Sequence, residues 1–382
     1  MTIKTKFPFV ILYSFCLLFI SMASQNQNPQ WKGTIEEEDG IKVIKNLREP
    51  FYGEITFDLE EDLRIGNEED ENYMFYRVRG VAVDGQGNIY ASDMSNCRIQ
   101  KFDKNGRYLM TIGRQGQGPG EFEQPTNMLV NDKTGNVFVK DRRRIEIFDR
   151  DGNYANSILP MNYPFDIYID AEDNIYGKLS SMTEDGDFRE FSKVGLNGEI
   201  DETYAKFPFY FILQSRSGEM MTAANTGYEP DLFISNIDND SFIYGFSMKY
   251  EFTVIDTQGK VLFKMAKDAQ EREFPAKEKR HLTKSKIFYK LPPYMPFFYS
   301  VFSDCKGRIY VQTNKQERAP VEKEIDIFSK DGYFLYETKL PTYTHVIKNG
   351  SLYAYVVDED AGIEYVKRYR IKNWEQIKEG IE

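Results

Sequence analysis

The sequence predicts an all-β fold: a six-bladed β-propeller of four-stranded antiparallel blades, closed by an N-terminal strand that completes the last blade. Three observations predict it: a repeated unit, strand-like patterns inside each unit, and a surplus outer-strand signal near the N-terminus. The clearest unit spans residues 81–112, with VAVDGQGNIYASD followed closely by NCRIQKFDKNGRYLMTI, and a second unit comes next. Repetition at a period of about 40 to 50 residues indicates an array of supersecondary units.

Four short strand signals make up the first unit. Apolar and β-branched residues at 81–83 precede a turn cluster, DGQGN, after which a second strand begins at Ile89. Ile99 and Phe102 alternate with polar neighbours, as in a half-buried strand. The Asn-Gly pair that follows is a strong hairpin signal and leads to a fourth strand over residues 108–112. Four such strands, repeated along a chain, are typical of propeller blades.

Two landmarks locate the other units: the turn that opens the second strand and the hairpin pair before the outer strand. The first landmark occurs at residues 87–90, 135–138, 173–176, 307–310 and 350–353. The second occurs at 105–106, 151–152, 197–198, 258–259 and 331–332. The fourth unit lacks the first landmark but keeps its strand register. The predicted blades are about 79–112, 126–159, 164–206, 231–265, 297–340 and 343–371.

The sixth unit lacks a fourth strand before the chain ends. The segment EITFDLEEDLR, residues 54–64, has the pattern of an outer strand and directly precedes the first blade. We therefore expect residues 54–60 to complete the sixth blade. Such closure removes free sheet edges, which otherwise invite aggregation.

The segment DMSNCRIQKFD, residues 93–103, resembles the NHL repeat, as does the glycine-rich loop that leads to Phe122 and Pro125. Over roughly residues 50–372 the chain resembles exported bacterial six-bladed β-propeller proteins built from NHL-like repeats. The first two blades match closely, the third and fifth loosely, and the fourth poorly. The resemblance implies the fold and leaves the activity open, because such relatives include lyases, lactonases and pure binding modules.

The N-terminus predicts export to the periplasm or the extracellular space. Lys4 and Lys6 precede an apolar stretch at 7–20 and then Ser-Met-Ala, so residues 1–23 have the pattern of a signal peptide. An uncleaved anchor is the rival interpretation, but the stretch is shorter than the ~20 residues that span a bilayer. A lipoprotein linkage through Cys16 is weaker, because bulky Phe15 precedes it.

Composition excludes some partners. The formal charge is −11, and loss of the signal leaves 47 basic against 60 acidic residues, near −13. This balance argues against nucleic acid and anionic lipid as partners. Aromatic residues form 15% of the chain, which suits sheets packed face to face.

Three segments lie outside the repeats. Residues 24–50 form a polar leader with a small hairpin (31–35 and 41–44), either packed on the ring of blades or serving as a spacer. The insertion 266–296, which contains His281, is either a lid or a solvated loop. The propeller itself spans 51–372, and residues 373–382 form a tail.

Several motifs have structural interpretations that we prefer. Glycines at 113, 116, 118 and 120 lie between strands, so we expect a loop between blades and no dinucleotide site. The alternating acids and amides at 236–240 lack the glycine and glutamate of a calcium loop. Cys97 and Cys305 fall in different blades and should be free thiols. Arg144 aligns with Arg98 and should pair with carboxylates between blades, whereas residues 142–143 project from a loop as a weaker candidate for anion contact.

The axial mouth, where the first strand of each blade begins, is the candidate ligand site. Alignment on the turns places polar side chains there, beside Gly80 of the first blade. They can hydrogen-bond a sugar or peptide, hold a divalent cation, or line a water-filled channel. The candidate ligand-binding residues are Arg79, Asn127, Asp166, Ser300, Thr344 and His345.

The sequence favours a noncatalytic binding or scaffold module for a glycan, peptide or protein partner, acting as a monomer without membrane insertion, cofactor or metal. With two histidines it cannot form the three-histidine zinc site of hydroxyglycine lyases, and it has no G-x-S-x-G nucleophile motif. The alternative is a metal-assisted hydrolase resembling gluconolactonase or paraoxonase propellers, with Asn127 and Asp166 as calcium ligands. A structural role in an envelope complex is a third hypothesis.

Overall fold

The computed structural model describes residues 30–209, 212–216, 220–223, 229–274, 276, 288–289, 292–313, 322–341 and 344–381. Contacts divide the chain into Met1–Trp31 and a second unit, Lys32–Glu382, and the second unit is described below. The predicted signal peptide and His281 lie outside the described residues. Within the described ranges, no helix has both the length and the apolar character needed to cross a membrane.

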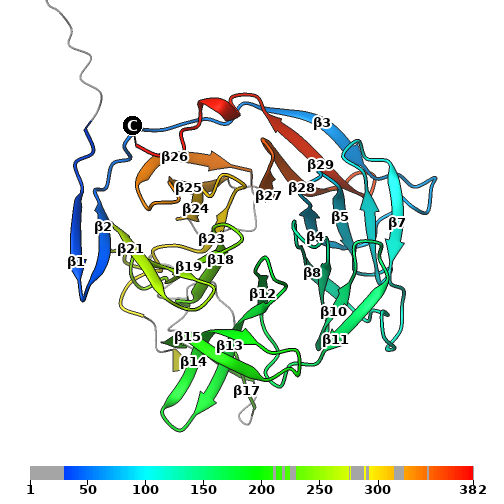
Figure 1. The fold of residues 1–382 in the computed structure, drawn as a ribbon, viewed down its shortest axis with the longest axis horizontal. Coiled ribbons are helices and arrows are strands. Elements are labelled where there is room, and N and C mark those ends of the chain that lie inside the picture. Colours follow the sequence, from blue (N-terminus) through cyan, green and yellow to red (C-terminus); the bar gives the residue numbers. More distant parts are fainter. Residues whose placement is uncertain are drawn as a thin grey trace, which may run out of the picture. The chain divides into compact units, whose positions relative to one another are not determined.

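Six antiparallel blades of four strands each stand around an axis, with the first strand of each facing the centre (Figure 1); five are separate four-stranded sheets, and blade four belongs to a six-stranded sheet. Blade one contains β4 (Val78–Val83), β5 (Ile89–Asp93), β6 (Arg98–Phe102) and β7 (Tyr108–Ile112). Blade two contains β8 (Pro125–Val130), β9 (Val137–Asp141), β10 (Arg144–Phe148) and β11 (Tyr154–Ile158). Blade three contains β12 (Asp166–Ile169), β13 (Ile175–Thr183), β14 (Gly186–Val194) and β15 (Ile200–Pro208).

The other three blades are built in the same way, and the predicted six-bladed propeller is confirmed. Blade four contains β18 (Leu232–Asn236), β19 (Ser241–Phe246), β20 (Glu251–Asp256) and β21 (Val261–Lys267). Blade five contains β23 (Ser300–Ser303), β24 (Ile309–Gln312), β25 (Lys323–Phe328) and β26 (Phe334–Leu340). Blade six contains β27 (Thr344–Lys348), β28 (Ser351–Asp358), β29 (Ile363–Ile371) and β3 (Leu59–Ile65).

An N-terminal strand closes the ring of blades as expected, but the predicted bounds, 54–60, are wrong. The strand that pairs with β29 is β3, in a register that joins Leu59 to Ile371 and Ile65 to Val366. Glu54 instead forms an isolated parallel bridge with Glu337 of blade five. The shift has a packing reason, because it directs the side chain of Ile65 into the core between blades six and one.

The hydrophobic core consists of layers between neighbouring blades. One layer, for example, joins Ile99 of blade one and Phe122 of the connecting loop to Val139 of blade two, and all three are fully buried. A single blade has no such partner for its faces, so the apolar surface is buried only when the blades stand side by side.

The leader packs on the ring of blades. Strands β1 (Thr34–Glu38) and β2 (Ile41–Asn46) form a hairpin, and β2 pairs in parallel with β21, which extends blade four to six strands. The Asn46 amide donates to the carbonyl of Gly332 (2.8 Å), and its oxygen accepts from the Phe334 N–H (2.9 Å). The next residues run along β26, where the N–H of Phe51 donates to the Phe334 carbonyl. The leader therefore links blades four and five.

The C-terminal residues also pack on the propeller, through the 3₁₀ helix η1 (Trp374–Gln376). The guanidinium of Arg308, fully buried, lies 4.0 Å from the centre of the Trp374 ring and donates to the carbonyl of Ile377 at 2.7 Å. Arg308 also pairs with Asp304 at 2.7 Å. The tail is thus held by blade five.

The direction of the strands separates two faces of the propeller. Because neighbouring strands are antiparallel, the links between blades lie on the same face as the turns between second and third strands. We call this the mouth face, since the first strand of each blade begins there. The turns between first and second strands lie on the opposite face, the turn face.

Two of the insertions on the mouth face pair with each other. Strands β16 (Ile212–Arg216) and β17 (Met220–Ala223) belong to the link between blades three and four. Strand β22 (Phe288–Tyr289), from the insertion after blade four, pairs with β16. The predicted insertion therefore contributes one strand to a small separate sheet.

Candidate functional site

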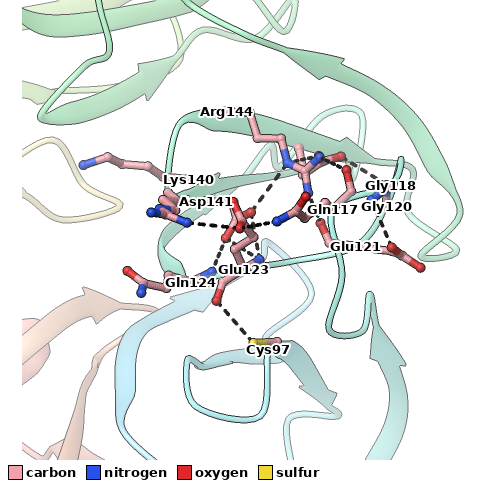
Figure 2. A network of polar contacts seen from close by, with 12 residues as sticks. Cys97, Gln117, Gly118, Gly120, Glu121, Glu123, Gln124, Lys140, Asp141 and Arg144 are labelled. Carbon is pink, nitrogen blue, oxygen red and sulfur yellow. Dashed lines mark hydrogen bonds and ion pairs between the residues drawn. The ribbon is translucent and has the colours of Figure 1, made fainter.

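Buried carboxylates at the ends of second strands hold the mouth-face loops in place. Asp141 is fully buried and accepts hydrogen bonds from the backbone N–H groups of Glu123 (3.0 Å) and Gln124 (2.5 Å) (Figure 2). Arg144 lies beside it, pairs with Glu146 at 2.8 Å and donates to two carbonyls of the loop between blades one and two. These bonds fasten the loop to blade two.

Blade one repeats the arrangement. Arg98 pairs with Asp93 at 3.0 Å and donates to the carbonyls of Glu71 and Met74. The predicted equivalence of Arg98 and Arg144 is therefore confirmed. Both pair with carboxylates of their own blade, and loop carbonyls supply the contact between blades.

The other motifs that we interpreted as structural behave as expected. The glycine loop is a connection between blades. Within it, Gln115 forms an isolated parallel β-bridge with Phe122, and Gly113 adopts a φ of +73°. Cys97 is a buried and Cys305 an exposed free thiol. Asp238 accepts from the N–H of Asp240 within the turn after β18.

The two loop arginines do not form an organised site. Arg142 makes an exposed ion pair with Glu123 at 3.1 Å, and Arg143 is exposed. Solvent screens such a pair strongly.

The axial channel brings together only some of the predicted ligand residues. A cavity of about 540 Å³ follows the first strands, with exposed Arg79 and half-buried Asn127 among its lining residues. Asp166 and Ser300 begin their strands as predicted but do not line this cavity. Thr344 and His345 lie at the start of β27, and their side chains lie outside the described residues.

An ion pair that the sequence analysis missed lies at the turn-face end of the channel. Lys348 of blade six reaches past blade one to Asp132 of blade two, with Nζ–O distances of 2.7 and 2.8 Å. The same ammonium donates to the carbonyl of Val83 at 2.9 Å. This contact joins three blades, and sequence spacing offers no signal for it.

Asp166 belongs instead to a charged group over blades two to four, which we call the mouth cluster: Lys140, Asp166, Lys178, Arg189 and Asp231. Lys178 Nζ lies 3.1 Å from Asp166 and 3.2 Å from Asp231. Arg189 Nε lies 3.1 Å from Asp231. Lys140 donates to the carbonyl of the residue before Asp166.

Charge in the mouth cluster favours anions over cations. Its side chains are three basic and two acidic, whereas the whole chain carries −11. Burial lowers the pKa of Lys140; the Asp166 carboxylate opposes that shift, and the Lys178 ammonium adds to it. A divalent cation at Asp166 would compete with the ammonium already 3.1 Å away.

Aromatic rings enclose the arginine of the mouth cluster. The Arg189 guanidinium carbon lies 4.1 Å from the centre of the Phe165 ring and 3.7 Å from that of Phe209. Phe165 remains 48% exposed, so the stack reaches the surface. The stack holds the guanidinium rigidly. Its Nε donates to Asp231 and one terminal nitrogen to the Ser180 hydroxyl, so among the described contacts the other terminal nitrogen is the donor left for a ligand.

One sequence signal could have found this cluster. Lys140 in VFVKD and Lys178 in IYGKL occupy the same position of the second strand in successive blades. Ser92 has that position in blade one and donates to the carbonyl of Pro125 at 2.8 Å. A side chain at this position therefore contacts the start of the next blade, and a lysine at this position places a positive charge on the mouth face. No comparable signal identifies Arg189 or Asp231.

Comparison with known proteins supports the fold and its repeats. Residues 68–224 match the DUF5128 family, described as a 6-bladed beta-propeller. A protein of Bacteroides fragilis NCTC 9343 described as exported has a similar structure, with a TM-score of 0.54, 12% identity and coverage of 86% of this chain and 99% of that chain.

Two curated relatives match parts of the chain. The protein brain tumor of Drosophila melanogaster is 28% identical over 106 residues, 26% of this chain and 10% of that protein. A probable peptidyl-alpha-hydroxyglycine alpha-amidating lyase of Caenorhabditis elegans is 25% identical over 122 residues, 31% of this chain and 29% of that protein. The chain thus spans less than a third of either relative.

The family match falls on the blades whose repeats are clearest in the sequence, and the described strands form the ring that such repeats require. The chain is a six-bladed β-propeller with NHL-like repeats, and its residues 68–224 match the DUF5128 propeller family.

Proposed function

We propose that the chain is an exported, noncatalytic binding module whose mouth cluster recognises an acidic group of a glycan, peptide or protein partner. Export rests on the signal-peptide pattern of residues 1–23. The observation that carries the binding role is the stack of Arg189 between Phe165 and Phe209, beside Lys178. The stack holds a rigid cation, itself 8% exposed, against the partly exposed ring of Phe165, and arginine binds carboxylates through its in-plane N–H donors.

The charge balance supports this partner class. A carboxylate placed among three basic and two acidic side chains neutralises the excess positive charge of the mouth cluster. Elsewhere an acidic partner meets repulsion from a chain of net charge −11. Binding should therefore be confined to this region and should weaken as salt is added.

The test compares acidic with neutral probes by calorimetry. Trigalacturonate is compared with maltotriose, and an acidic hexapeptide with its amide counterpart, so that glycan and peptide sources are distinguished. We expect an acidic probe to bind and its neutral counterpart to bind at least about tenfold more weakly, the size of one charge-assisted contact. The proposal is contradicted if acidic and neutral probes bind equally well, or if no probe binds.

Two variants assign the contact to the mouth cluster. Lys140→Gln and Arg189→Gln should each weaken binding of the acidic probe, whereas Arg143→Gln, an exposed loop arginine, should not. The metal-assisted hydrolase remains the alternative. If the purified protein contains a stoichiometric divalent ion, and Asp166→Asn loses it, the hydrolase hypothesis replaces the binding proposal.

A further inference from the structure

A second cavity lies away from the axial channel, between blades four and five. Its volume is about 780 Å³, within the range of about 300 to 1,000 Å³ typical of small-molecule sites. Its walls come from the end of β21 and the residues that follow it, from β25 and β26, and from residues 48–56, where the leader ends and the next segment begins. We call it the blade 4–5 cavity.

Two carboxylates share one ammonium in this cavity. Asp326 of β25 and Glu337 of β26 are directly opposite each other across the sheet. Lys267 Nζ lies 2.7 Å from Asp326 and 3.4 Å from Glu337. The hydroxyl of Tyr250 donates to the same Asp326 oxygen. The group thus has one negative charge more than positive.

Two of these three charged groups are buried, and the third faces the cavity. The side chains of Lys267 and Asp326 are 8% and 5% exposed, whereas that of Glu337 is 42% exposed and lines the cavity. Burial raises the pKa of Glu337, the Lys267 ammonium acts against that shift, and the Asp326 carboxylate adds to it. Facing like charges destabilise a sheet unless a cation lies between them.

Among the described residues, three other cations line the cavity. Lys339 of β26 lies opposite Glu324 of β25, and the two arginines are held by other groups. Arg272 donates to the backbone carbonyls of Thr313 (2.9 Å), Pro296 (2.6 Å) and Phe297 (3.3 Å). Arg48 lies 4.0 Å from Asp268 at an exposed position. Neither pairs with Glu337 in the described contacts, and further acidic residues, Glu54, Glu322 and Glu324, also line the cavity.

We propose that the blade 4–5 cavity binds an organic cation, a primary ammonium or guanidinium group that pairs with Glu337. Such a group restores charge balance beside the two carboxylates and can rest its apolar stem on the aromatic wall of Tyr250 and Phe297. A metal ion fits less well, because the Lys267 ammonium already contacts both carboxylates and the volume far exceeds that of an ion. The site is independent of the mouth cluster and goes beyond the function proposed for it.

The experiment uses three neutral-backbone probes on the full chain: the Nα-acetyl methylamides of lysine, arginine and norleucine. Norleucine keeps the stem of lysine and lacks its charge. We expect the lysine or arginine probe to bind, and norleucine to bind at least about tenfold more weakly. Norleucine binding equal to lysine, or no binding of either cation at about 10 mM, overturns the proposal.

Variants place the cation in the cavity. Glu337→Gln should weaken cation binding about tenfold or more, and Glu324→Gln at the rim should weaken it less. Glu60→Gln, an exposed glutamate of β3, is the matched control and should bind as the unmodified chain does. Glu337→Gln should fold, since the amide preserves shape and relieves the repulsion from Asp326. If Glu337→Gln binds the cation probes as well as the unmodified chain does, the assignment of the cation to the blade 4–5 cavity is refuted. This outcome is independent of the result with acidic probes at the mouth cluster.

Discussion

Asp141→Asn tests whether buried carboxylates hold the mouth-face loops. The carboxylate is fully buried and accepts from two backbone N–H groups, those of Glu123 and Gln124, with Arg144 Nε 3.5 Å away. Asparagine has the same shape but only one acceptor oxygen. Its NH2 group takes the place of the second carboxylate oxygen and therefore faces a backbone N–H donor that it cannot accept from. The variant also removes the charge that Arg144 faces.

The cost follows from these contacts. Losing one charge-assisted hydrogen bond, at about 1.5 to 3 kcal/mol, and weakening a second predicts a loss of about 2 to 5 kcal/mol in the free energy of unfolding. Breaking a buried ion pair by removing one partner costs a similar amount, about 3 to 5 kcal/mol. Arg144 keeps its contact with Glu146 at 2.8 Å, so the lower half of that range is expected.

Chemical denaturation measures the loss, and hydrogen exchange locates it. The amides of Glu123 and Gln124 should exchange faster in Asp141→Asn. The control is Arg142→Gln, which removes an exposed ion pair and should change stability by less than about 1 kcal/mol. A loss below about 1 kcal/mol in Asp141→Asn, with unchanged exchange at both amides, would show that the loop is held by other contacts.

Two further predictions concern ring closure and loop geometry. Asp62→Asn should cost about 1 to 2 kcal/mol at neutral pH, because Asp62 of β3 pairs with Arg368 (2.8 Å) and Arg370 (3.1 Å) of β29 at partly exposed positions. Burial acts to raise the pKa of Asp62, but the two arginines outweigh it and the pKa lies below its ordinary value of 3.8. The contribution of Asp62 is therefore present above that value and lost as pH falls through the lower folded-state pKa, so the variant and the parent should converge in acid. Gly113→Ala should cost about 3 kcal/mol or more, since a Cβ there would overlap the Phe122 ring and φ is +73°.

Each of these changes has a control. Gly40 shares a positive φ of +78°, but no atom lies within 4 Å of the place a methyl group would take, so Gly40→Ala isolates the backbone strain of about 1 kcal/mol. Equal losses at Gly40 and Gly113 would show that Phe122 yields to the methyl group. For Asp62, urea titrations at neutral and acidic pH provide the comparison, and a difference that persists in acid would contradict the ion-pair account.

The sequence predicts the fold well because the repeat is local. Turn residues and period-two alternation lie within a few residues of each other, and their recurrence implies a ring. The bounds of the closing strand were wrong because its segment contains two overlapping outer-strand patterns, residues 54–60 and 59–65. Register depends on partners distant in sequence, here Arg368 and Arg370 facing Asp62, and a local pattern does not contain that information.

The sites were harder to predict for the same reason. Alignment of strand starts identified Arg79 and Asn127, which do line the channel. It missed Arg189, which lies on a third strand and acquires its role only because Phe165 and Phe209 meet it in space. The blade 4–5 cavity depends equally on contacts between distant segments, since the leader supplies one wall.

Departure from the repeat coincides with the charged sites. The blades that match the repeat best, one and two, use their buried charges to fasten loops, as Asp93 and Asp141 do. Ring closure requires every blade to bury its faces but does not require each blade to anchor its loop through the same residues. Blades three to six lack the aspartate at this position, with Leu179, Phe246, Thr313 and Val356 in its place. Three of these, blades three to five, contribute most of the mouth cluster and both sheets beside the second cavity. A blade freed from the anchoring role can direct its charges toward a ligand, which is why the weakest repeats are where binding should be tested first.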